Sequence, residues 1–255
     1  MLDGRVAVVT GGGRGIGRAL AHSMASAGAD VVVSARTATD LAHVVDEIAE
    51  NGGRATSVIA DATDRTDAVR PVQAALDDYG RIDILVNNVG GTAPGDQHPY
   101  GDDLDAIEAT LTLNLTSAFR VTHAALPHMR AQGYGRVISI GSGASRRAAA
   151  SWAYTAAKHG LVGFTSQLAA ITGTDGITVN CLCPGWTNTS LVDFERLARI
   201  RDVTPVEARA AAEAESAQRR ILEPEELGPL AVLLASPAGG AITGQTIGVD
   251  GGYRL

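Results

Sequence analysis

Short apolar runs alternate along this chain with longer segments in which apolar residues recur every three or four positions. The short runs are rich in valine and isoleucine and end at glycine, asparagine, aspartate or proline, which is typical of buried β-strands. The longer segments have the spacing of amphipathic helices. Strands are predicted at residues 6–10, 31–35, 56–60, 84–88, 136–140, 177–182 and 245–250, and helices at 15–28, 38–51, 64–79, 103–131, 152–172 and ending at 235.

This alternation of buried strands and helices predicts an α/β fold, a doubly wound parallel sheet of Rossmann type with both faces covered. A length of 255 residues fits one large domain, and no linker or low-complexity segment divides it. Only residues 187–220 break the rhythm, because they are charged, alanine-rich and favourable to helices. We expect a small helical insertion there, which is either a lid over an active site or a surface excursion without functional motion.

Composition and charge exclude several classes of partner. The net charge of −7 disfavours nucleic acid. No apolar run reaches the ~18 residues of a membrane span, and the N-terminus lacks the features of a signal peptide, so a cytoplasmic location is expected. The two cysteines, Cys181 and Cys183, are interpreted as small buried thiols, and no metal site is predicted.

A glycine-rich turn follows the first predicted strand and opens the first predicted helix, with the sequence TGGGRGIG at residues 10–17. Such a turn lets the backbone approach a pyrophosphate closely, and the helix N-terminus favours its negative charge. Gly11, Arg14, Gly15, Ile16 and Gly17 are therefore candidates for binding a dinucleotide. A structural turn can have the same glycines, so the strand–loop–helix setting supports the interpretation more than the motif does.

The end of the second predicted strand bears on the choice of dinucleotide. A carboxylate there would accept hydrogen bonds from the ribose hydroxyls of NAD, but the chain has Ala35 followed by Arg36. The guanidinium groups of Arg36 and Arg14 would suit a 2′-phosphate, so NADP(H) is favoured over NAD(H). The alternative is that Arg36 is simply solvated.

The chain resembles the short-chain dehydrogenase/reductase family in its single-domain form of ~250 residues. The resemblance covers about residues 5–252 and rests on five motifs in the family's order. They are TGGGRGIG (10–17), NNVG (87–90), Asn114, Ser142 with YTAAK (154–158), and PGWTNT (184–189). The family's NNAG has Val89 in place of alanine here.

The resemblance implies roles for these residues, first among them catalysis by Ser142, Tyr154, Lys158 and Asn114. Lys158 would also hold the nicotinamide ribose, and Asn114 would anchor a water that resupplies Lys158 with protons. The other positions would bind the dinucleotide. These are Gly11, Gly15 and Gly17 at the pyrophosphate, Asp61 and Ala62 at adenine, Asn88 and Gly90 at the adenosine ribose, and Pro184, Gly185, Thr187 and Thr189 at the nicotinamide end.

Tyr154 and Lys158 are four residues apart in a predicted helix, so they share one face. A nearby ammonium stabilises a phenolate, which suits the tyrosine to exchange a proton with a carbonyl or alcohol oxygen. Lys158 is the only lysine among the 21 lysines and arginines, which suggests that guanidinium cannot replace it. Ser142 would hydrogen-bond the same oxygen. Its spacing from Tyr154 is one residue shorter than is usual in the family. Ser145 is therefore an alternative, and Ser139 on the predicted strand is a weaker one.

The expected activity is hydride transfer between NADP(H) and a ketone or secondary alcohol. Alternatives are a 3-oxoacyl-thioester or polyketide ketoreductase and, from another class, a non-catalytic dinucleotide sensor. Arg146 and Arg147 could meet an anionic group of the substrate, or could be exposed loop residues, while Val89, Trp152, Trp186 and residues 92–98 could form an apolar wall. The resemblance also implies a homotetramer, or a dimer.

Overall fold

A seven-stranded parallel sheet forms the centre of the computed structural model, which describes residues 1–96, 103–148 and 151–255. The strands lie in the order β3-β2-β1-β4-β5-β6-β7, and each neighbouring pair is parallel. Their bounds are β1 Val6–Thr10, β2 Asp30–Ala35, β3 Arg54–Ile59, β4 Ile84–Asn87, β5 Gly135–Ile140, β6 Ile177–Pro184 and β7 Thr246–Val249. The predicted doubly wound, Rossmann-like α/β fold is confirmed.

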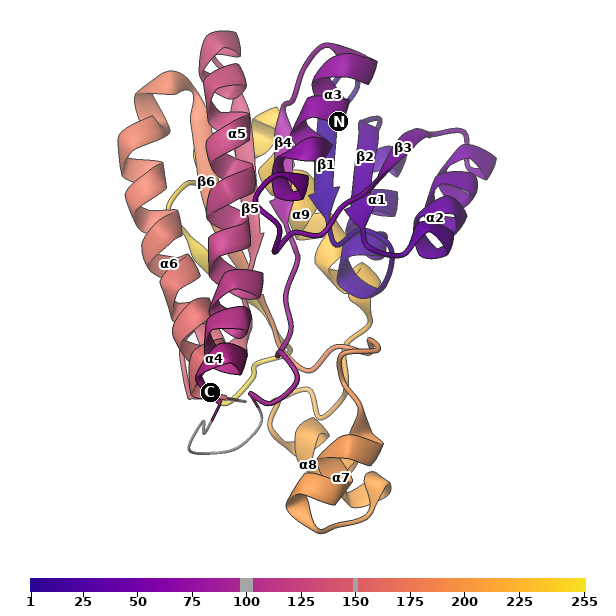
Figure 1. Ribbon diagram of the computed structural model, residues 1–255, viewed down its shortest axis with the longest axis vertical. Coiled ribbons are helices and arrows are strands. Elements are labelled where there is room, and N and C mark those ends of the chain that lie inside the picture. The colour runs from indigo at the N-terminus through magenta and orange to yellow at the C-terminus, as the bar shows by residue number, and fades with distance from the viewer. Residues whose placement is uncertain (97–102, 149–150) are drawn as a thin grey trace.

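Helices cover both faces of this sheet (Figure 1). One buried cluster joins α1, α2 and α9 to the sheet, and another joins α3, α5 and α6 to its opposite face. The helices among the described residues are α1 Gly15–Ser26, α2 Ala38–Glu50, α3 Arg70–Tyr79, α4 Leu104–Leu111, α5 Ser117–Gln132, α6 Trp152–Thr172, α7 Phe194–Arg201, α8 Pro205–Ala214 and α9 Gly228–Ala235. Alternate residues of each buried strand point to the two clusters, which explains the continuous apolar runs.

Two predicted helices differ from the structure in instructive ways. The helix predicted from residue 64 begins only at Arg70, because Asp61 and Asp64 hold the preceding chain in turns through bonds to backbone N–H groups. The helix predicted at 103–131 is interrupted by one turn of π-helix at Thr112–Thr116 between α4 and α5. Such π turns often occur at functional sites, and this one contains Asn114.

The order of the strands reverses between β1 and β4, since β2 and β3 extend the sheet in one direction and β5 to β7 in the other. Parallel sheets of this kind bind ligands at the carboxyl ends of the strands beside such a reversal. The glycine-rich turn follows β1 there, and Asn88 follows β4.

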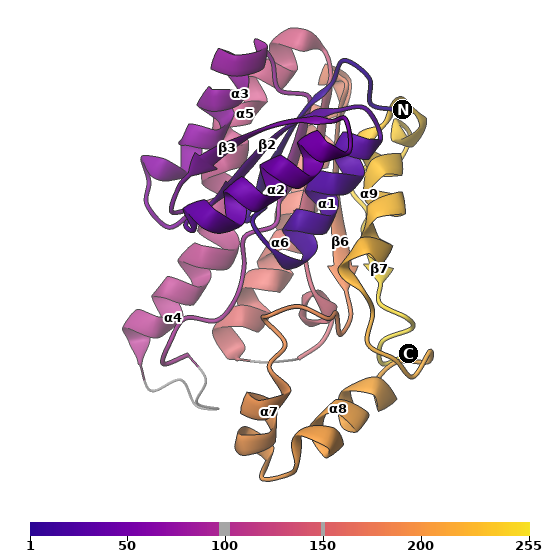
Figure 2. The same cartoon turned by 90° about the vertical axis from the view of Figure 1, so that its right-hand side faces the viewer.

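Residues 187–220 contain α7 and α8, as the predicted helical insertion requires. The two helices pack against each other and lie beyond the carboxyl ends of the strands, away from the helices that cover the sheet (Figures 1 and 2). Thr187 pairs with Leu222 where the chain leaves and re-enters the main body, so the two ends of the insertion are joined. Whether the insertion moves as a lid stays a prediction.

Candidate active site

A cavity of about 560 Å³ lies at the carboxyl edge of the sheet, between the main body and α7. The turns that follow β1, β2, β4, β5 and β6 contribute to its walls, as does the first half of α6. Nearly all the predicted site residues line it. Those that do are Gly11, Arg14, Gly15, Ile16, Arg36, Asp61, Ala62, Asn88, Gly90, Ser142, Tyr154, Lys158, Pro184, Gly185, Thr187 and Thr189.

The glycine-rich turn presents the N-terminus of α1 to the cavity. Arg14 is the N-cap residue, yet its side chain makes no capping hydrogen bond, and the first turn of the helix contains no acidic residue. Unpaired N–H groups at a helix start are a site for an anion such as a pyrophosphate. Gly11 and Gly15 have positive φ angles, of 63° and 54°, and a Cβ at Gly15 would lie 3.2 Å from the Thr189 Cγ2. Glycine is therefore needed here for conformation and for space.

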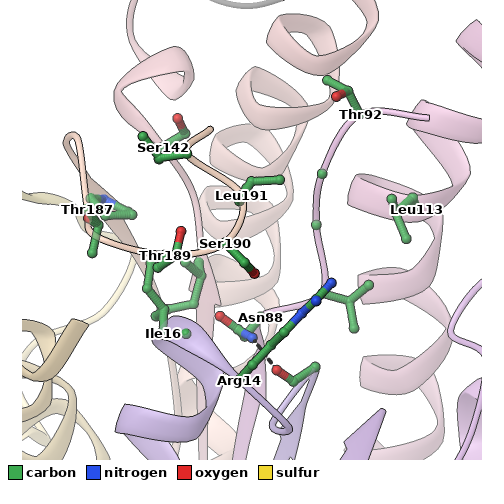
Figure 3. Close-up of a pocket in the computed structure, with 18 of the residues that line it drawn as sticks. Arg14, Ile16, Asn88, Thr92, Leu113, Ser142, Thr187, Thr189, Ser190 and Leu191 are labelled. Atoms are coloured by element: carbon green, nitrogen blue, oxygen red, sulfur yellow. Dashed lines mark hydrogen bonds between the residues drawn. The ribbon is translucent and has the colours of Figure 1, made fainter. Parts of the chain in front are cut away.

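Gly17 lies behind this turn and does not line the cavity. It is buried, and a Cβ there would overlap both the Gly11 carbonyl oxygen and the Asn88 amide nitrogen. Its contribution is the close packing of α1 against the turn. Asn88 fixes the turn from the other side, because its Nδ2 donates to the carbonyl oxygens of Thr10 and Gly11 at 3.1 and 3.0 Å. Figure 3 shows Asn88 beside the base of Arg14, whose side chain projects into the pocket.

One end of the cavity, beside β2 and β3, combines positive and negative groups. Arg36 and Arg14 line it with exposed guanidinium groups, neither of which has a hydrogen bond or ion pair to the chain that the structure describes. Asp61 accepts from the Thr63 backbone N–H at 2.8 Å, and this bond lowers the pKa of the carboxyl, with a smaller contribution from the charge of Arg36. An extended nucleotide with one added anionic group fits this donor set.

Tyr154 and Lys158 lie one turn apart on α6 and both face the cavity. The Lys158 Nζ lies 5.5 Å from the centre of the Tyr154 ring and donates to the Ile140 carbonyl oxygen at 2.8 Å. Lys158 is 3% exposed, so the ammonium of the chain's only lysine lies buried beside the Tyr154 ring.

The start of α6 is held by two residues whose role the sequence did not indicate. Ser151 is the N-cap and accepts from the Tyr154 backbone N–H at 3.1 Å. Its hydroxyl donates to the Asp96 Oδ2 at 2.6 Å, and both side chains are buried. This chain of bonds fixes the turn of helix from which Tyr154 projects.

Of the three serines considered, Ser142 alone lines the cavity among the described residues. Ser145 is 3% exposed and accepts from the Ser142 backbone N–H at 3.1 Å, so it supports the loop. Ser139 is fully buried on β5. The Ser142 Oγ accepts from the Ala144 N–H at 3.2 Å and is free to donate its own proton.

Asn114 lies behind the cavity wall, in the π turn, and is 1% exposed. Its side chain accepts from the Gly91 N–H at 3.1 Å and donates to the carbonyl oxygens of Gly91 and Thr110 at 2.6 and 2.8 Å. The point where a Cβ at Gly90 would lie is 2.9 Å from the Asn114 Oδ1 and 3.1 Å from the Lys158 Nζ. The Asn114 Oδ1 and the Lys158 Nζ therefore lie within about 6 Å of each other, a separation that a water can bridge.

Only some of the candidate substrate residues line the cavity. Arg146 and Arg147 donate to the carbonyl oxygens of Thr246 and Tyr253, and neither lines the described cavity. Trp186 lines it, together with Val89 and Thr92, whereas Trp152 is 56% exposed and does not. Residues 97–98 of the predicted apolar wall lie outside the described residues.

Several lining residues had no signal in the local sequence. Leu191, Val192, Arg196, Leu197 and Arg201 come from the helical insertion, and Tyr253 and Arg254 from the C-terminus. The Tyr253 ring packs against Gly143, where a Cβ would overlap the ring. Such contacts join segments that are far apart in the sequence, so no local pattern reveals them.

The sequence and the arrangement of this site agree with one family of proteins, whose model, the short chain dehydrogenase, matches residues 5–199. The chain belongs to the short-chain dehydrogenase family. It is 40% identical to the short-chain reductase protein NovJ of Streptomyces niveus over 97% of this chain and 93% of NovJ. It is 37% identical to the D-beta-hydroxybutyrate dehydrogenase of Cupriavidus necator over 99% of each chain.

Solved structures agree with these relatives. A candidate NAD(P) dependent gluconate 5-dehydrogenase from Beutenbergia cavernae, solved with bound NADP, matches with a TM-score of 0.88 at 38% identity, over 98% of this chain and 96% of that chain. This short-chain dehydrogenase is therefore an oxidoreductase that acts on CH–OH groups with a nicotinamide dinucleotide. No helix in the described part of the chain is long and apolar enough to cross a membrane.

Proposed function

We propose that this short-chain dehydrogenase transfers a hydride between NADP(H) and a ketone or secondary alcohol, with Tyr154 as the proton donor and acceptor. The observation that carries the proposal is that Tyr154, Lys158 and Ser142 line the same cavity as the open N-terminus of α1. Acid–base and anion-binding groups thus share one pocket, whose volume of about 560 Å³ lies in the range of ligand sites.

The nicotinamide supplies or accepts the hydride when the dinucleotide is bound. In reduction, the Tyr154 hydroxyl donates its proton to the carbonyl oxygen, and the Ser142 hydroxyl hydrogen-bonds that oxygen and orients it. Lys158 favours the phenolate that remains, because its ammonium is buried nearby. Proton return to Tyr154 through Lys158 and a water held by Asn114 is supported by the short distances around Gly90.

The preference for NADP(H) rests on Arg14 and Arg36, whose guanidinium groups line the end of the cavity beside β2 and make no ion pair within the described residues. Either could contact a 2′-phosphate in a charge-assisted hydrogen bond. The NADP bound to the gluconate 5-dehydrogenase candidate supports the same choice. Asp40 and Asp61 also line the cavity, and they would favour a free ribose instead, so this preference needs a direct measurement.

A 3-oxoacyl thioester remains a second candidate substrate, because a 3-oxoacyl-[acyl-carrier-protein] reductase of Synechocystis is 37% identical over 100% of this chain. A homotetramer and a cytoplasmic location stay predictions. The non-catalytic sensor is disfavoured, since a sensor needs no acid–base pair in its pocket.

The test is a panel of ketones and secondary alcohols assayed with NADPH, NADH and their oxidised forms. We expect turnover of at least one carbonyl, with kcat/KM for NADPH at least tenfold above that for NADH. A protein that binds NADPH and reduces no carbonyl would support the sensor, and a preference for NADH would overturn the assignment of Arg36.

A further inference from the structure

Helix α7 presents two arginines to the active-site cavity that the proposed reaction does not use. Arg196 and Arg201 both line the cavity, next to the apolar residues Leu191 and Leu197 of the same insertion. The first turn of α7 is fixed by Asp193, which accepts from the Arg196 backbone N–H at 3.0 Å. The backbone under Arg196 is therefore fixed, and the residue lines the cavity.

The Arg196 Nε is buried and has no hydrogen-bond partner within the described chain. A guanidinium has five N–H donors and no acceptor, and a buried donor of this kind is normally satisfied. The residues that line the cavity next to it in sequence, Leu191, Val192 and Leu197, have side chains that cannot accept a hydrogen bond. An acceptor that enters the cavity would satisfy it.

Neither guanidinium has a carboxylate within ion-pairing distance in the described chain, although acidic residues outnumber basic ones, 28 to 21, and the Asp193 carboxylate bonds the Arg196 backbone instead. Other arginines in or near the insertion have acidic partners: Arg209 pairs with Glu213, Arg220 with Glu226 and Arg254 with Glu215. Within the described residues, Arg196 and Arg201 form no ion pair. Two unpaired positive charges at the cavity wall create a local field that attracts anions into an otherwise acidic protein.

The phosphates of the dinucleotide have other candidate partners in this chain. The open N-terminus of α1 faces the pyrophosphate site, and Arg14 and Arg36 face the proposed 2′-phosphate site. The acidic lining residues Asp40 and Asp61 lie beside β2 and β3, whereas α7 follows the Pro184–Thr189 turn after β6. An anion on the substrate is the remaining ligand that matches the charge of α7.

We infer that Arg196, assisted by Arg201, binds an anionic group of the carbonyl substrate, and thereby determines the class of substrate. The substrate is then an oxo compound that carries a carboxylate or a phosphate at a distance from the reacting carbonyl. This inference rests on the proposed carbonyl reduction. It assigns the recognition of an anion to the helical insertion, in place of Arg146 and Arg147, which hydrogen-bond the C-terminal backbone.

The test compares charged and uncharged substrates that share the same oxoacyl group. The probes are acetoacetate and levulinate with their methyl esters, and acetoacetyl-CoA with the neutral N-acetylcysteamine thioester of the same acyl group. The variants are Arg196→Gln, Arg201→Gln, the conservative Arg196→Lys, and Arg199→Gln as the matched control. Arg199 lies on the same helix and is exposed, and it does not line the described cavity.

We expect the wild type to prefer the charged member of at least one pair. In Arg196→Gln, kcat/KM for that member falls by about tenfold to a hundredfold, mainly through KM, as the loss of one charge-assisted hydrogen bond implies. Activity on the neutral member and the dissociation constant of NADPH stay within about twofold. Arg201→Gln gives a smaller loss, Arg196→Lys recovers part of the activity, and Arg199→Gln behaves as the wild type.

The two kinds of probe distinguish which anion is bound. Preference for acetoacetate or levulinate identifies an oxo acid, and preference for acetoacetyl-CoA identifies a phosphate-bearing thioester. Equal losses on charged and neutral probes, or weaker binding of NADPH by Arg196→Gln, would overturn the inference and leave carbonyl reduction intact. Turnover of the neutral probes with no preference for any charged one would also overturn it. If the wild type reduces none of the probes, and no other carbonyl in the panel, the proposed function fails as well.

Discussion

Replacement of Gly90 by alanine would place a methyl group between Asn114 and Lys158. The added Cβ would lie 2.9 Å from the Asn114 Oδ1 and 3.1 Å from the Lys158 Nζ, both closer than ordinary van der Waals contact. The backbone itself accepts alanine, because Gly90 is not among the glycines with positive φ. The effect of the substitution is therefore confined to the space around the two side chains.

The loss of stability in Gly90→Ala depends on how far the Asn114 side chain can move away from the added methyl group. It is 1% exposed and held by three hydrogen bonds to Gly91 and Thr110, so little movement is available. Overpacking at such a site costs about 1–3 kcal/mol. For a chain of this length, that cost lowers the melting temperature by roughly 2–4 °C per kcal/mol.

The methyl group would also occupy space between the two polar groups and hinder a water that links them. If that water returns protons to Lys158, kcat for carbonyl reduction should fall by about tenfold to a hundredfold, within the range of general acid–base effects. The assay is steady-state kcat with a substrate found in the panel, together with fluorescence titration of NADPH and thermal unfolding. NADPH binding should stay within about fivefold, since the contribution of one methyl is below ~1 kcal/mol.

The matched control is Gly163→Ala on the same helix as Tyr154 and Lys158. A Cβ at Gly163 meets no atom within 4 Å, so alanine should leave kcat unchanged and raise helix stability by up to ~1 kcal/mol. Wild-type kcat and melting temperature in Gly90→Ala would refute both the packing argument and the water path.

Other predictions concern residues outside the space between Gly90, Asn114 and Lys158. Arg36→Ser should lower kcat/KM for NADPH by about tenfold or more, since the contact with the 2′-phosphate is lost. The kcat/KM for NADH should stay within about twofold of the wild type. Equal losses of kcat/KM with both cofactors would contradict a contact between Arg36 and the 2′-phosphate. Ser151→Ala should destabilise the protein by about 1 kcal/mol through loss of the α6 cap. It should also lower kcat, because the cap fixes the turn that holds Tyr154. Unchanged kcat in kinetic assays would show that the cap stabilises the helix without positioning Tyr154. Hydrogen bonds from Arg18, and secondarily from His22, lower the pKa of Glu47 to about 2 from 4.5, so its contribution to stability is complete above pH ~4.5 and is lost as the pH falls toward 2. The difference in urea unfolding midpoint between wild type and Glu47→Gln should therefore be larger at pH 6 than at pH 3, and a difference independent of pH would contradict the assignment.

The sheet and its order of elements could be predicted because the buried strands are continuous runs of valine and isoleucine. The turn before α3 could not, since Asp61 and Asp64 form local hydrogen bonds that compete with helix formation. The π turn at Thr112–Thr116 was also missed, because one extra residue per turn hardly changes the apolar spacing.

The glycine turn, Tyr154 and Lys158 were accessible from the sequence because their chemistry depends on local spacing. The spacing between Ser142 and Tyr154 left the choice of serine open. In the structure Ser142 lines the cavity and Ser145 is buried under the loop, and the catalytic role of Ser142 stays a prediction. Arg196 could not be placed, because its position in the cavity depends on how the whole insertion packs. Its neighbours in sequence give no sign of it.

The central claim is that Tyr154 exchanges the proton with the substrate oxygen. Its most direct test is the rate of carbonyl reduction by Tyr154→Phe, which keeps the ring and removes only the hydroxyl, measured with saturating NADPH and with NADPH binding determined separately. The account predicts that kcat falls by about 10²–10⁴ while the dissociation constant of NADPH stays within about threefold. Turnover at the wild-type rate in Tyr154→Phe would contradict it.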